Sequence, residues 1–178
     1  KEVFVFSEKS WFEATSQLYM DAIPWGKSPS EWHSSKCFTT YVNLKKEEHD
    51  AWLDDIVEKH LLLSKVLYHR NLKGLTTNSG YVSITGKDLG EIDFLIVCPA
   101  IKKVLVAECK HLMGRYDTVN WKNDYYHFVG NGNGNSYNEK LSRKVNWIAS
   151  NMFLVQEHLR MKYTIPELSL ENYIVECV

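Results

Sequence analysis

Three charged residues, Asp93, Glu108 and Lys110, lie within or directly beside two segments that are otherwise apolar. The segments, 92–98 and 103–109, are rich in Val, Ile and Leu and are too short to favour a helix. Both are therefore predicted strands, and the residues between them suit a tight hairpin loop. Isolated charges are costly in an apolar sheet unless they are paired or bind a metal. These three side chains are therefore the first candidates for chemistry.

The pairing of the two predicted strands decides whether the charges meet. Antiparallel pairing about the loop centre, between Ala100 and Ile101, places Asp93 opposite Glu108. Directly opposed Cβ atoms lie roughly 4.5–5.5 Å apart, and two carboxylates that close repel each other. A divalent cation between them removes the repulsion, and Mg²⁺ prefers carboxylate oxygens as ligands. Lys110 shares a strand face with Glu108, so it can orient a water or stabilise a developing oxyanion.

This arrangement of an Asp on one strand and Glu-x-Lys on the next resembles the PD-(D/E)xK nuclease superfamily. Asp93, Glu108 and Lys110 match the motif, and the Gly-Glu-Ile-Asp run that ends at Asp93 resembles the NERD-like branch. Ile92 stands where the family usually has Pro. The resemblance implies an α/β protein with a restriction-endonuclease-like αβββαβ core, in which helices flank a mixed central sheet.

The resemblance also implies a metal-dependent nuclease. Asp93, Glu108 and the backbone carbonyl of Cys109 would hold one or two Mg²⁺ or Mn²⁺ ions, and Lys110 would position or deprotonate the attacking water. DNA is favoured over RNA as the substrate. Two alternatives stay open. One is a catalytically inactive module of the same fold that binds nucleic acid or scaffolds a larger complex. The other is a non-nuclease α/β domain in which Glu108 and Lys110 form a structural ion pair.

The segments around the hairpin complete the expected order. Apolar residues at helical spacing predict an amphipathic helix over 45–63, and the family spacing makes Asp54 on this helix a further candidate metal ligand. Glu58 and Glu47 are the alternatives to Asp54. The remaining core elements are expected to be a strand over 65–72, a short strand over 81–85, a helix over 138–160 that Asn138 caps, and a strand over 172–178.

Candidate nucleic-acid contacts follow the Glu-x-Lys motif. The connection 111–137 is predicted to be irregular, and its Arg115 and Lys122 stand among aromatic residues. Cations bind phosphate and rings stack on bases, so this composition suits a nucleic-acid strand. Lys140 and Lys144, one turn apart on the next predicted helix, are the other candidates.

Composition limits the class of protein. The chain has 178 residues, of which 1–44 are read as an extension of unassigned role and 45–178 as the nuclease-like domain. A net charge of −1 disfavours a purely electrostatic nucleic-acid binder, so the rest of a longer polypeptide, or a partner, is expected to select the target. Four cysteines without metal-ligand spacing favour an intracellular location. None of the apolar runs is long enough to predict a membrane span.

Overall fold

The computed structural model describes residues 7–9, 12, 16, 30–85, 89–110, 118–130 and 136–178. The chain divides into two compact units, Lys1–Trp52 and Leu53–Val178, and the second contains the sheet. The predicted division into 1–44 and 45–178 stays a prediction. In chain order the elements are η2 (Ser30–Ser34), α2 (Lys36–Ser64), β1 (Leu67–Leu72), β2 (Gly74–Thr77), β3 (Gly80–Ser83), β4 (Ile92–Cys98), η4 (Pro99–Ile101), β5 (Lys103–Ala107), α3 (Thr118–Val129), α4 (Tyr137–Ser150), α5 (Met152–Tyr163) and β6 (Ile174–Cys177).

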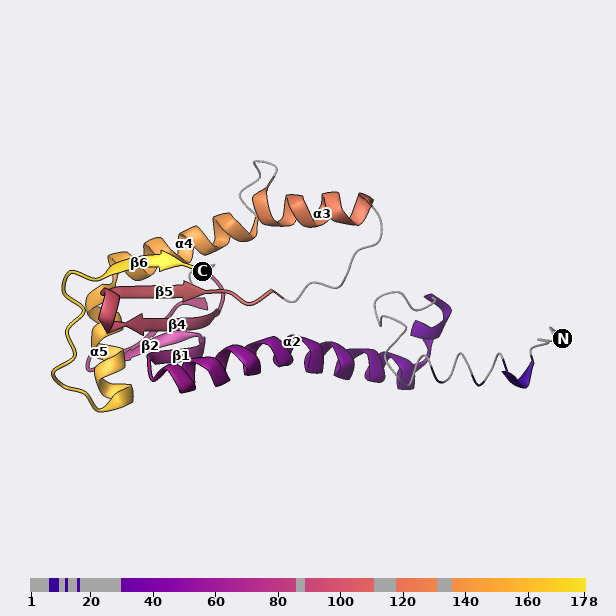
Figure 1. Ribbon diagram of the computed structural model, residues 1–178, viewed down its shortest axis with the longest axis horizontal. Coiled ribbons are helices and arrows are strands. Elements are labelled where there is room, and N and C mark those ends of the chain that lie inside the picture. The colour runs from indigo at the N-terminus through magenta and orange to yellow at the C-terminus, as the bar shows by residue number, and fades with distance from the viewer. Residues whose placement is uncertain are drawn as a thin grey trace. The chain divides into compact units, whose positions relative to one another are not determined.

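The main sheet is mixed and has the strand order β1-β4-β5-β6 (Figure 1). The pairs β1–β4 and β4–β5 are antiparallel, whereas β6 runs parallel to β5. A parallel neighbour needs a crossover connection, and α3, α4 and α5 lie in the chain between β5 and β6. The strands β2 and β3 form a separate hairpin. The predicted α/β class is confirmed, and so are the strands expected near 65–72, 81–85 and 172–178.

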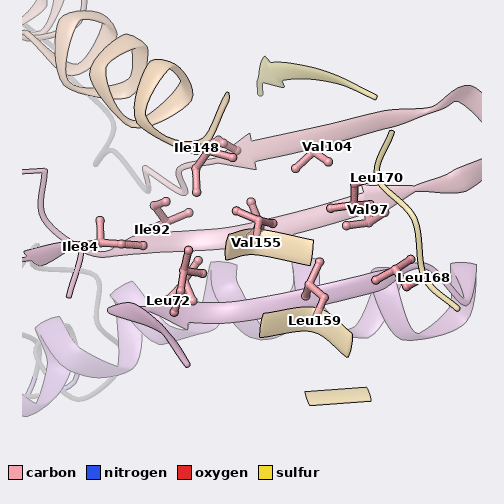
Figure 2. Packing of buried hydrophobic residues seen from close by; sticks show 13 residues of the cluster. Leu72, Ile84, Ile92, Val97, Val104, Ile148, Val155, Leu159, Leu168 and Leu170 are labelled. Carbon is pink, nitrogen blue, oxygen red and sulfur yellow. The ribbon is translucent and has the colours of Figure 1, made fainter. Parts of the chain in front are cut away.

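Hydrophobic clusters cover the two faces of this sheet, because alternate residues of β4 and β5 point to opposite sides. On one side Val97 and Val104 pack with Ile148 of α4 and with Val155 and Leu159 of α5 (Figure 2). On the other side Phe94, Ile96 and Ala107 pack with Val57 and Leu61 of α2. The sheet therefore lies between α2 on one face and α4 with α5 on the other.

Helix α2 begins at Lys36, nine residues before the predicted start at 45. The hydroxyl of Ser35 accepts a hydrogen bond from the Phe38 N–H at 3.5 Å, so a serine directly before the helix satisfies one of its free backbone donors. This capping serine is the signal that the prediction missed. Among the residues that the structure describes, none of the helices combines the length and apolarity that crossing a membrane requires.

The helix predicted over 138–160 is two helices, α4 and α5, that meet at Asn151. The Asn151 side chain donates to the Trp147 carbonyl at 2.7 Å, and such a local bond competes with regular helical pairing. The predicted cap at Asn138 is also wrong. Ser136 is the N-cap, and it forms a reciprocal capping box with Glu139.

The connection 111–137 was expected to be irregular, but residues 118–129 form helix α3. Most of its described side chains are exposed, among them Val119, Trp121, Tyr125 and Tyr126. A helix without a buried apolar stripe has weak periodicity, which explains why the sequence pattern did not predict it. Residues 111–117 and 131–135 lie outside the described part of the chain, and Arg115 is among them.

Two histidines, His69 and His158, join β1 to α5. The Thr76 N–H donates to His158 Nδ1 at 2.9 Å, so the proton of neutral His158 sits on Nε2. That nitrogen lies 2.7 Å from His69 Nδ1, which therefore accepts the hydrogen bond. Burial lowers the pKa of both rings, that of His69 to about 4, and nearby Lys162 lowers both further. The pair is built to be neutral.

We expect this histidine pair to make folding stability depend on pH. Because the folded-state pKa of His69 is below the ordinary value of 6.5, the unfolded chain binds more protons in that interval. The stability contribution is therefore complete above about pH 6.5 and is lost as the pH falls toward 4. Denaturant melts of wild type and of His69→Gln at several pH values measure this, and the variant should show the shallower slope. His60→Gln, at an exposed position of α2, is the matched control and should keep the wild-type slope.

Candidate active site

The predicted register of the central hairpin is confirmed. Strands β4 and β5 pair with Phe94 opposite Ala107 and Leu95 opposite Val106. The same register, continued by one residue past the end of β5, sets Asp93 opposite Glu108. The loop closes through η4 and Lys102, which adopts a left-handed conformation and returns its N–H to the Pro99 carbonyl. The geometry of the loop therefore determines where the acidic residues lie.

The residues that follow β5 are divided between the two faces of the sheet. Val104 and Val106 belong to the cluster beneath α4 and α5, so Glu108 and Lys110 continue that row. Cys109 packs instead with the cluster beneath α2. Asp93 contacts both sides, because it lies 3.8 Å from Lys110 Nζ and has a carboxylate oxygen within 4.8 Å of the Cys109 sulfur and of an Asp54 oxygen; its Oδ2 also accepts the Cys109 N–H at 2.7 Å. The Asp93 carboxylate therefore belongs both to the group of side chains on the α4 face and to the group on the α2 face.

The α4 side brings two acids to one ammonium. Lys110 Nζ lies 3.5 Å from Glu108 Oε2 in addition to its contact with Asp93. The Lys110 ammonium also lies 5.5 Å from the centre of the Tyr137 ring, at the start of α4. The three residues that the sequence singled out are thus brought together by the structure. The Lys110 ammonium, close to both Asp93 and Glu108, lowers the repulsion that their carboxylates would otherwise experience.

Lys144 of α4 is the residue whose role sequence reasoning missed. Its ammonium donates to Glu108 Oε1 and to the Glu91 carbonyl, and only 7% of its side chain is exposed. Glu108 is therefore paired with Lys110 through one oxygen and with Lys144 through the other. The signal for this pair was weak, because lysines on a helix are usually solvent-exposed. The predicted contact of Lys144 with nucleic acid stays a prediction.

On the α2 side, Asp54 approaches the shared carboxylate. One potential ligand atom from each of Asp54, Asp93 and Cys109 lies within 4.8 Å of the others. Burial raises the pKa of the Asp54 carboxyl, and the nearby Asp93 charge raises it further, whereas the hydrogen bond with the Cys109 thiol lowers it. Burial, followed by the hydrogen bond to Asp54, raises the pKa of the Cys109 thiol to about 12. The structure thus brings Asp54 to the predicted site.

The alternatives to Asp54 are placed differently. Arg70 Nη1 donates to Glu58 Oε2 at 2.6 Å and to Asp55 Oδ1 at 2.7 Å. The hydrogen bond from Arg70 to Glu58 is the main cause that lowers the pKa of Glu58. Arg70 lies farther from Asp54, at 3.8 Å. The guanidinium therefore neutralises the flanking acids of α2 most strongly. Glu47 belongs to the other compact unit.

A pocket of about 390 Å³ opens beside the α4 half of the site. It combines the acidic and basic groups of the hairpin end with two aromatic rings. Its lining includes Glu108, Lys110, Lys140, Lys144, Phe128 and Tyr137. Lys140 thus lies at the pocket, and its contact with nucleic acid stays a prediction. Lys122 is exposed on α3, 5.8 Å from the Tyr126 ring, and is absent from the lining of this pocket.

Comparison with known proteins finds no matching family model, no similar curated protein and no similar solved structure. The case for a function therefore depends on the residues and their geometry.

Proposed function

We propose that this chain hydrolyses phosphodiester bonds in nucleic acid, with DNA favoured over RNA, in a reaction that depends on Mg²⁺ or Mn²⁺. One observation carries the proposal: Asp93 and Glu108 converge on the ammonium of Lys110 at the end of two paired strands. Acidic ligands with a cation beside them are the side chains that metal-assisted hydrolysis of a phosphodiester requires.

The donor atoms at the hairpin end fit a hard divalent cation. Asp93 and Glu108 offer carboxylate oxygens, the Cys109 backbone can add a carbonyl, and Asp54 brings another carboxylate close to Asp93. Mg²⁺ and Mn²⁺ select such oxygen ligands. When bound, the cation supplies a water of lowered pKa and neutralises charge that develops on the phosphate. The sharing of Asp93 between the two faces is consistent with one or two ions.

The basic residues have distinct tasks in this proposal. Lys110 orients the attacking water and stabilises the developing negative charge, because its ammonium lies beside both carboxylates. Lys144 fixes the Glu108 carboxylate from α4 and acts as a positioning residue. Lys140, exposed at the pocket, is the residue that binds a phosphate of the substrate.

Aromatic residues near the pocket support a nucleic-acid substrate. Phe128 and Tyr137 line it with their rings 5.2 Å apart in an edge-on contact. Helix α3 adds the exposed rings of Trp121, Tyr125 and Tyr126. Rings of this kind stack on bases while lysines bind the backbone, and stacking contributes about 1–3 kcal/mol per base.

The order of the elements also supports membership of the PD-(D/E)xK superfamily. Helix α2 precedes three antiparallel strands of the main sheet, and α4 and α5 precede the parallel strand β6. With the β2–β3 hairpin treated as an insertion between β1 and β4, and α3 to α5 as the crossover, this order is compatible with an αβββαβ core. We propose the family on this order together with the motif residues.

The second candidate is an inactive module of the same fold that binds nucleic acid or scaffolds a complex. The observation that favours it is the buried pair of Lys144 with Glu108, which occupies an oxygen that a metal would use. In an inactive module this pair is a permanent structural contact. In the nuclease, Glu108 would hold the cation through the oxygen that does not contact Lys144, or Lys144 would give up its contact with Glu108.

A cleavage assay separates these functions. Supercoiled plasmid, linear duplex, single-stranded DNA and RNA are each incubated with the chain in Mn²⁺ and, in parallel, in excess EDTA. The proposal expects cleavage of at least one DNA substrate in Mn²⁺ and intact DNA in EDTA. Shifted but uncleaved DNA would support the inactive module, and RNA as the only cleaved substrate would contradict the choice of DNA.

A further inference from the structure

The side chain of Cys109 gives the hairpin end a ligand that an oxygen-only magnesium site does not have. Its thiol belongs to the α2 face, where it is hydrogen-bonded to Asp54 and lies close to Asp93. All three side chains are partly exposed, and their potential ligand atoms lie within 4.8 Å of one another. One sulfur and two carboxylate oxygens thus lie close together on side chains that are only partly buried.

This donor set distinguishes between classes of cation. Sulfur is a poor ligand for Mg²⁺ and Mn²⁺ but a good one for Zn²⁺ and Cd²⁺. Zinc accepts mixed sulfur and oxygen ligands, with bonds of about 2.3 Å to sulfur and about 2.0–2.2 Å to oxygen. Three protein ligands and one water would complete a four-coordinate site. The three ligand atoms, which now lie within 4.8 Å of one another, must draw closer together to reach such bonds.

The surrounding charges leave this point available. Arg70 forms its short hydrogen bonds with Asp55 and Glu58, at 2.7 and 2.6 Å, and stays 3.8 Å from Asp54. Lys110 reaches Asp93 from the opposite face of the sheet, at 3.8 Å. The carboxylates of Asp54 and Asp93 therefore each have their cationic partner at 3.8 Å, a longer contact than those that Arg70 makes with Asp55 and Glu58.

We propose that Cys109 Sγ and the carboxylates of Asp54 and Asp93 form a binding site for a thiophilic divalent cation of the Zn²⁺ or Cd²⁺ type. The thiol releases its proton to solvent as the metal–sulfur bond forms. Because Asp93 belongs to both faces, a cation held here competes with the hard cation of the proposed nuclease. This competition rests on the proposed function, whereas the site itself rests on its own three side chains.

Cadmium titration tests the site directly, because a thiolate bound to Cd²⁺ has an ultraviolet charge-transfer band. The parent protein for this test carries Cys37→Ser and Cys177→Ser, which remove the two exposed thiols. We expect a band that saturates at one Cd²⁺ per chain in this parent and that disappears with Cys109→Ser. Cys98→Ser is the matched control, since Cys98 packs in the same cluster, and it should keep the band.

A second pair of variants tests whether the carboxylates bind Cd²⁺. Asp54→Asn should weaken Cd²⁺ binding at least about tenfold, since loss of even an outer-shell partner has an effect of that size. Asp55→Asn, on the adjacent residue that pairs with Arg70, should leave Cd²⁺ affinity unchanged. Circular dichroism of each variant verifies its fold. A parent without the band, or a band that persists with Cys109→Ser, would overturn the site.

The outcome for this site and the outcome for the nuclease are distinguishable. A parent that binds Cd²⁺ through Cys109 but cleaves nothing in Mn²⁺ would retain the thiophilic site and remove the proposed function. A parent that cleaves in Mn²⁺ but shows no cadmium band would retain the proposed function and remove the thiophilic site. If both hold, Cd²⁺ should inhibit cleavage by the parent, and Cys109→Ser should relieve that inhibition at the same Cd²⁺ concentration.

Discussion

Lys110→Met is expected to slow DNA cleavage at least about a thousandfold while the protein still binds Mn²⁺. A thousandfold loss corresponds to about 4 kcal/mol of transition-state stabilisation, which is within the range for a charged group that acts on the developing oxyanion. Lys110 lies at 3.5–3.8 Å from the two carboxylates, so its removal leaves the acidic ligands in place. The rate under single turnover and Mn²⁺ affinity by calorimetry measure the two effects separately.

The matched control for Lys110 is Lys140→Met. Both lysines line the same pocket, but among the described residues the ion pairs of Asp93 and Glu108 are with Lys110 and Lys144 and not with Lys140. Lys140→Met should therefore raise the KM for DNA and leave kcat within about threefold of wild type, because it removes binding that is equal in ground state and transition state. Equal losses of kcat in both variants would contradict the role given to Lys110.

Glu108→Gln is expected to destabilise the fold by about 3 kcal/mol, apart from its effect on catalysis. The substitution leaves the Lys144 ammonium buried with the Glu91 carbonyl as partner and without the carboxylate that neutralises it. Removal of one partner from a buried ion pair typically costs 3–5 kcal/mol. For a chain of this length the loss lowers Tm by about 6–12 °C. Urea melts followed by circular dichroism measure the change.

A double-mutant cycle separates the pair from its surroundings. Lys144→Met should cost less than Glu108→Gln, because Glu108 keeps Lys110 at 3.5 Å as a second partner. The variant with both substitutions should be more stable than Glu108→Gln alone, since it no longer contains an unpaired buried charge. Simple addition of the two single losses would show that the pair is not energetically coupled.

The hairpin was predictable from sequence because the forces that form it are local. The apolar alternation and the short loop around Ala100 determine the register, and that register brings Asp93 to Glu108. The class of fold followed from the order of apolar segments for the same reason. Asp54 was a candidate because of the family spacing on the predicted helix, with Glu58 and Glu47 as alternatives, and the structure places its carboxylate close to Asp93.

The contacts that the sequence did not reveal join distant parts of the chain. Lys144 meets Glu108 across 36 residues, and no local pattern distinguishes a buried lysine from an exposed one. Arg70 gathers Asp55 and Glu58 in the same way, from the strand after their helix. Strand side chains alternate, so the Cys109 thiol faces α2 while Glu108 and Lys110 of the motif face the other side of the sheet. The motif alone therefore did not predict a role for this thiol.

The break between α4 and α5 has a different cause. Apolar residues continue at helical spacing through Asn151, so periodicity alone predicts one long helix. The Asn151 side chain instead bonds to the Trp147 carbonyl, and the chain begins a new helix at Met152. The Ser136 cap, by contrast, was visible in the sequence as Ser-x-x-Glu ending at Glu139.

The most direct test of the central claim compares wild type with Asp93→Asn in single-turnover cleavage of labelled DNA over a range of Mn²⁺ concentrations. Asp93 is the carboxylate that both faces of the hairpin end share, and the substitution removes its charge while preserving its shape. The claim predicts Mn²⁺-dependent cleavage by wild type and a loss of at least about a thousandfold in Asp93→Asn that more Mn²⁺ does not restore. Equal cleavage by the two proteins, purified identically and both folded, would contradict it.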